Sequence, residues 1–413
     1  MKRRDFLKLA GAVSLAGCAT PAPSKARVVV VGGGFGGATA AKYIRVWDSS
    51  IDVVLVERDT SFVSCPISNL VLGGFTGMAE ISRGYDGLRR HGVQVVHDEA
   101  VAIDAAKKTV RLARGGDLAY ERLIVSPGID FLFGDIAGYD AAMQDGAALH
   151  AWKAGPQTVA LRRQLEGMRD GGVYVLSIPV APYRCPPGPY ERASMVAAYF
   201  KQAKPRSKVL VLDANPDVTS KAGLFKRAWS DLYQGILEFR GNAKVVAVER
   251  GVVRTEFDAI RGDVLNVVPP HRAGDLAAKS GLITTNNRWC DVDWRSMESK
   301  AVKGVHVLGD ATLSAPGMPK SASMANNHAK IAAAAVVELL NGRAPQPVKI
   351  INTCYSFVSP KEGIRVSSVH QWDDGQGTLV PVKGSGGVSA ARSEAEGTFA
   401  WNWARTIWAD SLA

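Results

Sequence analysis

Four cysteines beyond the N-terminal segment are the residues best suited to redox chemistry: Cys65, Cys185, Cys290 and Cys354. None belongs to a CxxC or CxxCH pair, so the chain carries neither a zinc-ribbon motif nor a haem c attachment motif. Cys185 precedes a helix predicted for residues 191–201, and a helix N-terminus favours the thiolate form of a nearby cysteine. This position predicts a redox-active thiol. The alternative is an inert thiol packed as a small apolar side chain.

Three glycines with G-x-G-x-x-G spacing, Gly32, Gly34 and Gly37, form a second chemical pattern. An apolar run at 27–31 indicates a buried parallel strand before them, and residues 38–46 continue as a helix. The first glycine permits a tight turn, the second lets backbone approach a pyrophosphate, and the third lets helix and strand pack closely. Free N–H groups at the helix N-terminus favour phosphate. The pattern predicts a dinucleotide site.

The next strand supplies an acid at the spacing that such a site requires. Residues 51–56 indicate a second strand, and Glu57 follows it, 20 residues after Gly37. A carboxylate at this point can accept hydrogen bonds from a ribose diol. The combination of strand, glycine triplet, helix, strand and acid favours a bound nucleotide over a simple glycine-rich turn.

Two later segments distinguish FAD from NAD. Residues 303–310 read Lys-Gly-Val-His-Val-Leu-Gly-Asp and predict a strand that ends in Gly309 and Asp310. They resemble the second FAD fingerprint of flavoproteins of the pyridine-nucleotide-disulfide-reductase type, whose aspartate holds the ribitol. Residues 120–128 resemble the intervening strand and turn of that family. A helix predicted for 323–340 could direct its N-terminus at the flavin pyrimidine. These segments predict FAD.

A second βαβ unit in mid-chain lacks a glycine triplet. Strands are predicted at 172–178 and 208–213, and the segment between them, 179–191, is rich in proline. Proline has no N–H group and cannot open a turn that cradles phosphate. The sequence therefore disfavours NADH as the electron donor and favours a smaller reductant.

Several segments together resemble the flavoprotein subunit of flavocytochrome c sulfide dehydrogenase. They are Glu57-Arg58, Ser64-Cys65-Pro66-Ile67-Ser68-Asn69, the run from Tyr183 to Arg192, and Asn352-Thr353-Cys354-Tyr355-Ser356. The similarity extends in order from Arg27 to the C-terminus. The segment around Cys185 is its most specific part.

The resemblance implies roles for individual residues. Cys65 matches the residue that carries FAD through a thioether to the flavin 8α-methyl carbon, and Cys185 and Cys354 match a redox disulfide beside the isoalloxazine ring. Hydrosulfide would attack this disulfide and leave a persulfide on one cysteine and a thiolate, assigned to Cys354, near the flavin. Glu191 matches a carboxylate that could move protons, although an exposed acid in the first helical turn is the alternative. No role carries over to Cys290, for which a buried structural thiol is expected.

The resemblance also implies a partner. Because this chain has no haem motif, the haem c that receives the electrons would belong to a separate c-type cytochrome subunit. The formal net charge of +11 is spread along the chain without a run of like charges. This distribution predicts a solvated surface, or one that attracts an acidic partner, and not a nucleic-acid-binding surface.

The predicted architecture is α/β, with two Rossmann-like βαβ domains arranged as in the glutathione-reductase-like FAD fold, and a C-terminal α+β domain. Residues 375–387 are rich in glycine and predict a loop, and residues 398–413 predict a short helix with three tryptophans, for which core or interface packing is the default. The predicted domains are an export signal at 1–26, a discontinuous FAD domain at 27–150 and 285–345, a second Rossmann-like domain at 151–284, and an interface domain at 346–413.

The N-terminus resembles a twin-arginine export signal. Arg3 and Arg4 are followed by Asp-Phe-Leu-Lys and a mildly apolar run of small residues, which predicts a periplasmic protein exported after folding; an ordinary secretory signal is the alternative. Residues 15–18 resemble a lipoprotein cleavage box, so membrane contact is expected only if Cys18 is lipidated. No stretch reaches the roughly 20 apolar residues of a membrane span.

Two other functions compete with a cytochrome-linked sulfide dehydrogenase. A sulfide:quinone oxidoreductase would share the fold and the sulfur chemistry but deliver electrons to quinone. It would favour a strongly amphipathic C-terminus and no export signal. A flavin-bearing binding or chaperone subunit without turnover is the second alternative, and retention of both Cys185 and Cys354 argues against it.

Overall fold

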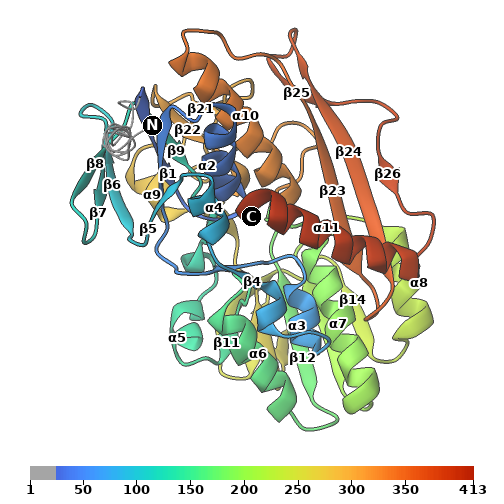
Figure 1. Ribbon diagram of the computed structural model, residues 1–413. Coiled ribbons are helices and arrows are strands. Elements are labelled where there is room, and N and C mark those ends of the chain that lie inside the picture. The colour runs from blue at the N-terminus through green and yellow to red at the C-terminus, as the bar shows by residue number, and fades with distance from the viewer. Residues whose placement is uncertain (1–24) are drawn as a thin grey trace, which may run out of the picture.

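The computed structural model describes residues 25–413, so the predicted export signal and Cys18 lie outside the described residues. The first structural unit is a largely parallel sheet flanked by helices (Figure 1). β1 (Ala26–Val31) and β2 (Ile51–Val56) pair in parallel, and α2 (Phe35–Trp47) connects them. The sheet order is β20 (Val292–Asp293), β21 (Glu298–Ser299), β22 (Val305–Val307), β9 (Arg122–Val125), β1, β2 and β5 (Gln94–Val96).

The continuous apolar run of β1 reflects burial on both faces. Val28, Val29 and Val30 are completely buried, as expected for an inner strand of a parallel sheet covered by helices. α10 (Ala322–Leu340) packs against α2, and Figure 1 shows the two helices side by side. Segments that are far apart in the chain therefore pack together in one unit.

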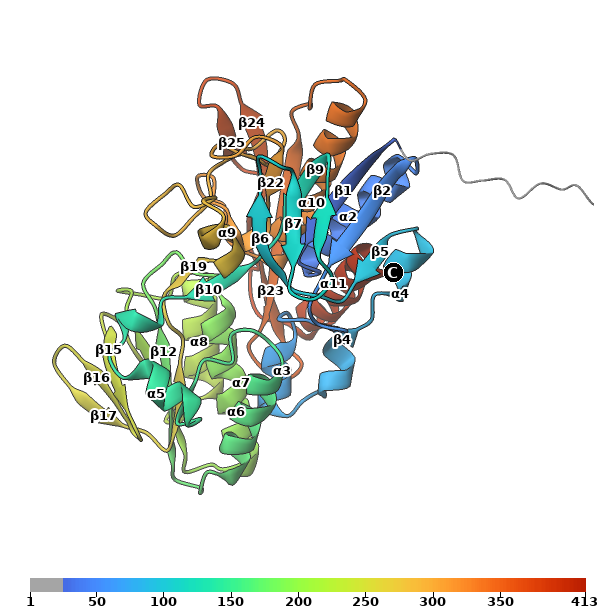
Figure 2. The ribbon, with the colours of Figure 1, turned by 90° about the vertical axis from the view of Figure 1, so that its left-hand side faces the viewer.

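The second unit is a five-stranded parallel sheet that lies below the first unit in Figure 2. Strand β12 (Val173–Ile178), helix α7 (Gly188–Ala203) and strand β13 (Lys208–Asp213) form the second βαβ unit. The remaining strands are β11 (Ala148–Leu149), β18 (Val264–Val267) and β14 (Leu237–Arg240), and the other helices are α6 (Pro156–Gly167) and α8 (Ala222–Leu232). β11 lies in this second sheet although the predicted boundary at residue 150 assigns it to the first domain.

The C-terminal part contributes an antiparallel sheet and a long helix. β23 (Lys349–Phe357) pairs with β24 (Gly363–Asp373), and α11 (Glu394–Leu412) packs on both strands and on α2. β24 also pairs with β25 (Thr378–Pro381) and β26 (Gly387–Val388). The prediction of a loop over 375–387 was therefore wrong for residues 378–381, because the apolar Leu379 is completely buried against the sheet.

Two predicted helices begin earlier than expected. α7 starts at Gly188 and not at residue 191, because proline is compatible with the first turn of a helix and Pro189 stands there. α11 starts at Glu394 and not at residue 398, because the Ser393 side chain accepts a hydrogen bond from the backbone N–H of Glu396. Of its tryptophans, Trp408 is buried and donates a hydrogen bond to the Ser64 hydroxyl at 2.9 Å.

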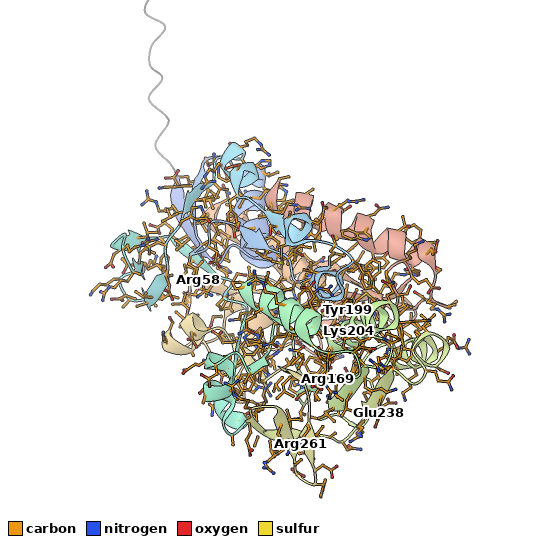
Figure 3. The ribbon with its side chains drawn as sticks, turned by 90° about the horizontal axis from the view of Figure 1, so that it is seen from below. Arg58, Arg169, Tyr199, Lys204, Glu238 and Arg261 are labelled. Atoms are coloured by element: carbon orange, nitrogen blue, oxygen red, sulfur yellow. The ribbon has the colours of Figure 1, made fainter. Side chains whose placement is uncertain are left out.

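Shorter elements complete the described chain. They are β3 (Phe62–Val63), β4 (Ser82–Arg83), β6 (Ala100–Asp104), β7 (Thr109–Leu112), β8 (Asp117–Ala119), β10 (Ile129–Phe131), β15 (Val245–Glu249), β16 (Val252–Thr255), β17 (Ala259–Arg261), β19 (His271–Ala273), α3 (Ser68–Gly73), α4 (Asp86–Arg90), α5 (Tyr139–Gln144), α9 (Asp275–Lys279) and the 3-10 turns at 78–81, 133–135 and 309–311. Across residues 25–413, no helix is both long and apolar enough to cross a bilayer. Basic side chains are spread over the molecule, as the well-separated labels of Arg58, Arg169 and Arg261 in Figure 3 illustrate.

Candidate active site

The glycine loop between β1 and α2 has the shape that a bound pyrophosphate requires. Gly32 adopts a φ of +96°, and a Cβ atom there would lie 2.3 Å from the Ser126 carbonyl oxygen. A Cβ atom on Gly37 would lie 1.8 Å from the Gly32 carbonyl oxygen, so this glycine allows helix and strand to meet. A Cβ atom on Gly34 would meet no atom within 4 Å. The loop is therefore tight on its protein side and open on its ligand side.

Glu57 lies beside this loop, as predicted. Its Oε2 accepts a hydrogen bond of 2.6 Å from the backbone N–H of Gly33, and its Oε1 accepts one of 2.9 Å from Asp59 N–H. These bonds fix the carboxylate at the end of β2, next to the glycine turn. The position suits a ribose hydroxyl donor.

Asp310 supplies an independent test of whether FAD fits the site. Gly309 and Asp310 form a 3-10 turn directly after β22, and the Asp310 Oδ1 atom is buried without a hydrogen-bond partner in the protein. Burial raises the pKa of Asp310, while the charges of Arg184 and Lys320 oppose that rise. A buried carboxylate oxygen without a donor is costly. A ribityl hydroxyl group would satisfy it, so the residues present fit FAD.

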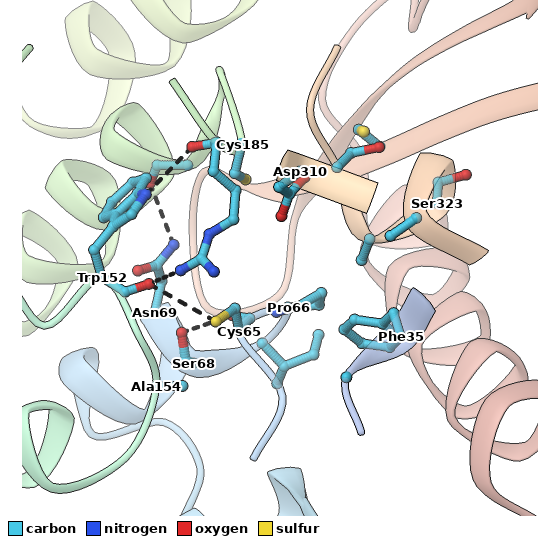
Figure 4. Close-up of a pocket in the computed structure, with 18 of the residues that line it drawn as sticks. Phe35, Cys65, Pro66, Ser68, Asn69, Trp152, Ala154, Cys185, Asp310 and Ser323 are labelled. Carbon is cyan, nitrogen blue, oxygen red and sulfur yellow. Dashed lines mark hydrogen bonds between the residues drawn. The ribbon is translucent and has the colours of Figure 1, made fainter. Parts of the chain in front are cut away.

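One cavity of about 300 Å³ connects the glycine loop with the predicted redox residues (Figure 4). It brings together side chains from both βαβ units and from the C-terminal sheet, which are separated by up to hundreds of residues in the chain. Its lining includes Gly34, Phe35, Cys65, Asn69, Trp152, Cys185, Glu191, Asp310, Ser323 and Cys354.

Cys185 and Cys354 line this cavity from different elements. Cys185 lies just before α7 in a left-handed conformation, with φ of 59°, and its N–H donates to the Lys320 carbonyl oxygen at 2.8 Å. Cys354 lies in β23, and its thiol donates to Asn352 Oδ1 at 3.3 Å. Both are free thiols in the structure. The fold therefore places two cysteines 169 positions apart at one site.

The electrostatic environment of Cys185 differs from the expectation based on the helix N-terminus. Burial raises the pKa of the Cys185 thiol, and neighbouring Cys354 and Glu191 raise it further. Arg184 and Lys221 act in the opposite direction but are the smaller influences. The prediction that the helix N-terminus favours the thiolate of Cys185 was wrong. Burial destabilises the thiolate more than the helix N-terminus stabilises it.

Glu191 is buried, which excludes the exposed alternative. Its Oε2 accepts a hydrogen bond of 2.7 Å from Asn69 Nδ2, and its Oε1 accepts one of 2.8 Å from Phe357 N–H. Burial raises the pKa of this carboxyl. Glu191 can therefore hold a proton beside Cys185 more readily than a surface glutamate could.

Lys221 is a residue of this site that sequence reasoning missed. It precedes α8, is 7% exposed, and its Nζ donates to the Ser356 hydroxyl at 2.8 Å and to the Cys354 carbonyl oxygen at 3.3 Å. Burial lowers the pKa of Lys221 to about 8. The local sequence Thr-Ser-Lys-Ala-Gly contains no motif that indicates a functional lysine. Lys221 comes close to β23 only in the tertiary fold.

The other two cysteines have different environments. Cys65 follows β3, is half-buried in the cavity wall, and its Sγ lies 3.8 Å from the Trp152 carbonyl oxygen, which also accepts a hydrogen bond from Arg184 (Figure 4). Cys290 is completely buried in the core, does not line the cavity, and burial raises its pKa to about 12. These features are those of an inert thiol, as expected for Cys290.

In the second βαβ unit, the acid that would bind the ribose of a nicotinamide cofactor is already hydrogen-bonded to other residues. Asp213 ends β13, the place where such a unit offers its ribose-binding acid. Its Oδ2 instead accepts a hydrogen bond of 2.7 Å from the Tyr190 hydroxyl, and Asn215 binds its Oδ1. The acid is therefore satisfied within the protein.

The fold and the site together define an FAD-dependent oxidoreductase related to the pyridine nucleotide-disulphide oxidoreductases, whose family model matches residues 26–155. Residues 158–269 match the central part of the sulfide dehydrogenase (flavocytochrome c) flavoprotein chain, and residues 346–412 match the flavin-binding part of flavocytochrome c sulphide dehydrogenase. The chain belongs to this flavocytochrome c sulfide dehydrogenase flavoprotein family. It is a sulfide-oxidising flavoprotein, and FAD is its cofactor.

Individual relatives agree with this assignment. The chain is 69% identical over 45 residues to the sulfide dehydrogenase (flavocytochrome c) flavoprotein chain of Chlorobaculum thiosulfatiphilum, which covers 11% of this chain and 94% of that sequence. It is 24% identical over 329 residues to the mitochondrial sulfide:quinone oxidoreductase of Mus musculus, covering 74% and 71% of the two chains. The structure of the sulfide:quinone oxidoreductase from Aquifex aeolicus superposes with a TM-score of 0.77 at 17% identity, covering 93% and 91% of the chains, and shows the shared fold.

Proposed function

We propose that this flavoprotein oxidises hydrosulfide through a disulfide formed between Cys185 and Cys354, and that a c-type cytochrome is the final electron acceptor. The observation that carries the proposal is the shared cavity: both thiols line it together with the unpartnered carboxylate of Asp310 and the open side of the glycine loop. Substrate chemistry and cofactor binding thus have a common site.

The first chemical step is thiol–disulfide exchange. Hydrosulfide attacks one sulfur of the oxidised pair, the sulfur–sulfur bond breaks, and the products are a persulfide on one cysteine and a thiolate on the other. Glu191 lies close enough to Cys185 to raise that thiol's pKa. Its buried carboxyl can accept or return the thiol proton when the disulfide forms and breaks.

FAD, when bound, supplies an acceptor for an electron pair that can be released one electron at a time. Asp310 and Glu57 would hold its polar groups, and Phe35 and Trp403 line the cavity with apolar surface. Cys65 shares the cavity, which supports a thioether between its sulfur and the flavin 8α-methyl carbon. Such a bond would keep the cofactor attached outside the cytoplasm.

Membership of the family supports a cytochrome acceptor, and the N-terminal sequence supports a periplasmic location. The chain has no haem attachment motif of its own, so the haem c would be supplied by a partner chain. The twin-arginine-like start supports export of the folded, FAD-loaded protein, with a membrane anchor only if Cys18 is lipidated. The net charge of +11 is compatible with an acidic partner.

A visible spectrum under anaerobic conditions tests this proposal. Sulfide is expected to bleach the flavin absorbance. NADH is expected to leave it unchanged, because the Asp213 carboxylate that would bind its ribose is hydrogen-bonded to Tyr190. Bleaching by NADH alone would overturn the proposal. The acceptor is then tested with oxidised cytochrome c and, separately, with a short-chain quinone. Faster turnover with quinone would favour the sulfide:quinone oxidoreductase alternative, and cytochrome binding without sulfide-dependent bleaching would favour a binding subunit.

A further inference from the structure

Lys221 joins the two halves of the sulfur site. It belongs to the second βαβ unit, while both acceptors of its hydrogen bonds, the Cys354 carbonyl oxygen and the Ser356 hydroxyl, belong to β23. The side chain is buried, and its backbone is in the left-handed region with φ of 57°, which is uncommon for a lysine. Strained backbone of this kind is held in place only when surrounding contacts determine it.

A hydrogen-bond network provides those contacts. The Tyr190 hydroxyl donates to Asp213 Oδ2 at 2.7 Å and accepts a bond of 3.0 Å from the Thr219 N–H. The Thr219 hydroxyl also lies 2.9 Å from the Tyr183 hydroxyl. Thr219 is two residues before Lys221. The acid that would bind ribose in a nicotinamide domain is therefore used here to anchor the turn that carries Lys221.

Four titratable side chains influence the charge of Lys221. Burial lowers its pKa, and the surrounding anions oppose that change. Burial raises the pKa of Cys354, and the charge of Lys221 is the largest influence that opposes this rise. For Cys185, the charge of Arg184 opposes the rise more strongly than that of Lys221 does. The groups that act on Lys221 are Cys354, Glu191, Cys185 and Glu396, and Asp310 also acts on Cys354.

We propose that Lys221 is a positioning residue that directs cleavage of the disulfide, so that Cys354 leaves as the thiolate and Cys185 receives the sulfide. The inference rests on the proposed function. Hydrosulfide forms a bond to Cys185 Sγ and keeps its proton on the terminal sulfur, while the electron pair of the broken bond moves to Cys354 Sγ. The hydrogen bonds from Lys221 Nζ to β23 hold its positive charge on the Cys354 side of the pair.

The test compares Lys221→Met with Lys204→Met as a matched control. Lys204 is also buried in the second unit and donates to two backbone carbonyl oxygens, those of Glu166 and Met168, but unlike Lys221 it makes no hydrogen bond to β23 and does not act on the pKa of Cys185 or Cys354 (Figure 3). Iodoacetamide alkylation of Cys354 in the reduced, FAD-loaded protein is followed by peptide mass spectrometry from about pH 7 to about pH 11, because burial raises the pKa of this thiol. The midpoint is expected to rise by about one pH unit or more in Lys221→Met and to stay unchanged in Lys204→Met.

Lys221→Arg keeps the positive charge and is expected to hold the Cys354 midpoint near that of the wild type. Equal midpoints in Lys221→Met and the wild type, or a midpoint in Lys221→Arg as high as in Lys221→Met, would overturn the inference.

If Lys221→Met does not fold, Cys354→Ser provides the reciprocal measurement by NMR of ¹³C-methylated lysine. The Lys221 pKa should fall when the thiolate is lost, and an unchanged value contradicts the coupling.

The experiment separates the two proposals. Thiol titration requires neither sulfide nor an electron acceptor, so it reports on Lys221 alone. Failure of the proposed function would instead appear as an absence of sulfide-dependent bleaching in the wild-type protein.

Discussion

The Tyr190 hydroxyl binds Asp213 Oδ2 at a distance of 2.7 Å, at the end of β13 where a nicotinamide domain would hold ribose. Both side chains are completely buried. An internal donor thus replaces the ligand that this acid would otherwise bind, while the βαβ architecture around it is retained. The same hydrogen bond supports the turn that carries Lys221. The acid that would bind ribose in a nicotinamide domain therefore helps to build the sulfur site here.

Tyr190→Phe should destabilise the protein because it removes a hydrogen bond from a buried carboxylate. A loss of about 1–3 kcal/mol in the free energy of unfolding is expected, measured by urea denaturation at constant pH. Tyr199→Phe is the matched control: Tyr199 lies on the same helix, and its ring contacts the Arg162 guanidinium at 4.1 Å, a contact that phenylalanine keeps. Equal stability of the two variants would contradict the role of the Tyr190 hydroxyl.

Asp310→Asn should weaken FAD binding, since the buried carboxylate oxygen has no other donor. We expect about 10- to 100-fold weaker binding, as for loss of a hydrogen bond to a charged group. The variant is made in a Cys65→Ser background so that a covalent link does not retain the flavin, and the ratio of flavin to protein absorbance is measured after gel filtration. Asp258→Asn, on an exposed hairpin, is the control and should retain FAD.

Cys65→Ser tests the proposed thioether directly. Acid precipitation of the wild-type protein should leave the yellow colour in the pellet, whereas the variant should release it to the supernatant. Cys290→Ser, which changes a cysteine outside the cavity, should behave as the wild type does. Release of colour from the wild type would rule out the covalent bond and leave the proposed sulfide chemistry intact.

Replacement of either Cys185 or Cys354 by serine should abolish bleaching of the flavin by sulfide, with a rate loss of at least about a thousandfold, because the two sulfurs act as one unit. Dithionite should still bleach both variants, which shows that FAD is present and reducible. Sulfide-dependent bleaching at the wild-type rate in either variant would mean that the sulfide donates electrons by another route.

Stability should fall as the pH drops below about 6.5. Burial lowers the pKa of His150 to about 3, of His306 to about 4 and of His328 to about 3, so the folded protein keeps these rings neutral. The unfolded chain binds protons on them near pH 6.5, and therefore unfolding takes up protons at lower pH. Each ring should cost about 1.4 kcal/mol per pH unit between pH 6 and 5.

Urea denaturation at pH 7.5, 6 and 5 measures this dependence. His306→Asn should reduce the slope by the contribution of one proton, while His91→Asn, at an exposed position, should leave it unchanged. A midpoint that does not change between pH 7.5 and 5 would contradict the assignment of neutral buried rings.

Much of the FAD-binding half could be predicted from the sequence because its signals are local. Gly32 requires a backbone conformation that glycine tolerates best, and Gly37 must let another backbone approach. Asp310 follows a short apolar strand, and Glu57 follows another at the expected spacing. Each of these features depends on a few neighbouring residues, so their types and order were sufficient to predict fold class and cofactor.

The sulfur site depended on the tertiary structure. Only the packing of β23 against the second unit brings Cys354 into the cavity of Cys185 and places Lys221 beside it. The pKa of Cys185 also followed from packing, since burial outweighs the helix end that the sequence emphasised. The spacing of a motif reflects local backbone geometry. The desolvation of a group and its distance from other charges depend instead on which distant segments of the chain pack around it. The sequence by itself therefore determined the cofactor fold, and the tertiary structure decided the electrostatics of its redox pair.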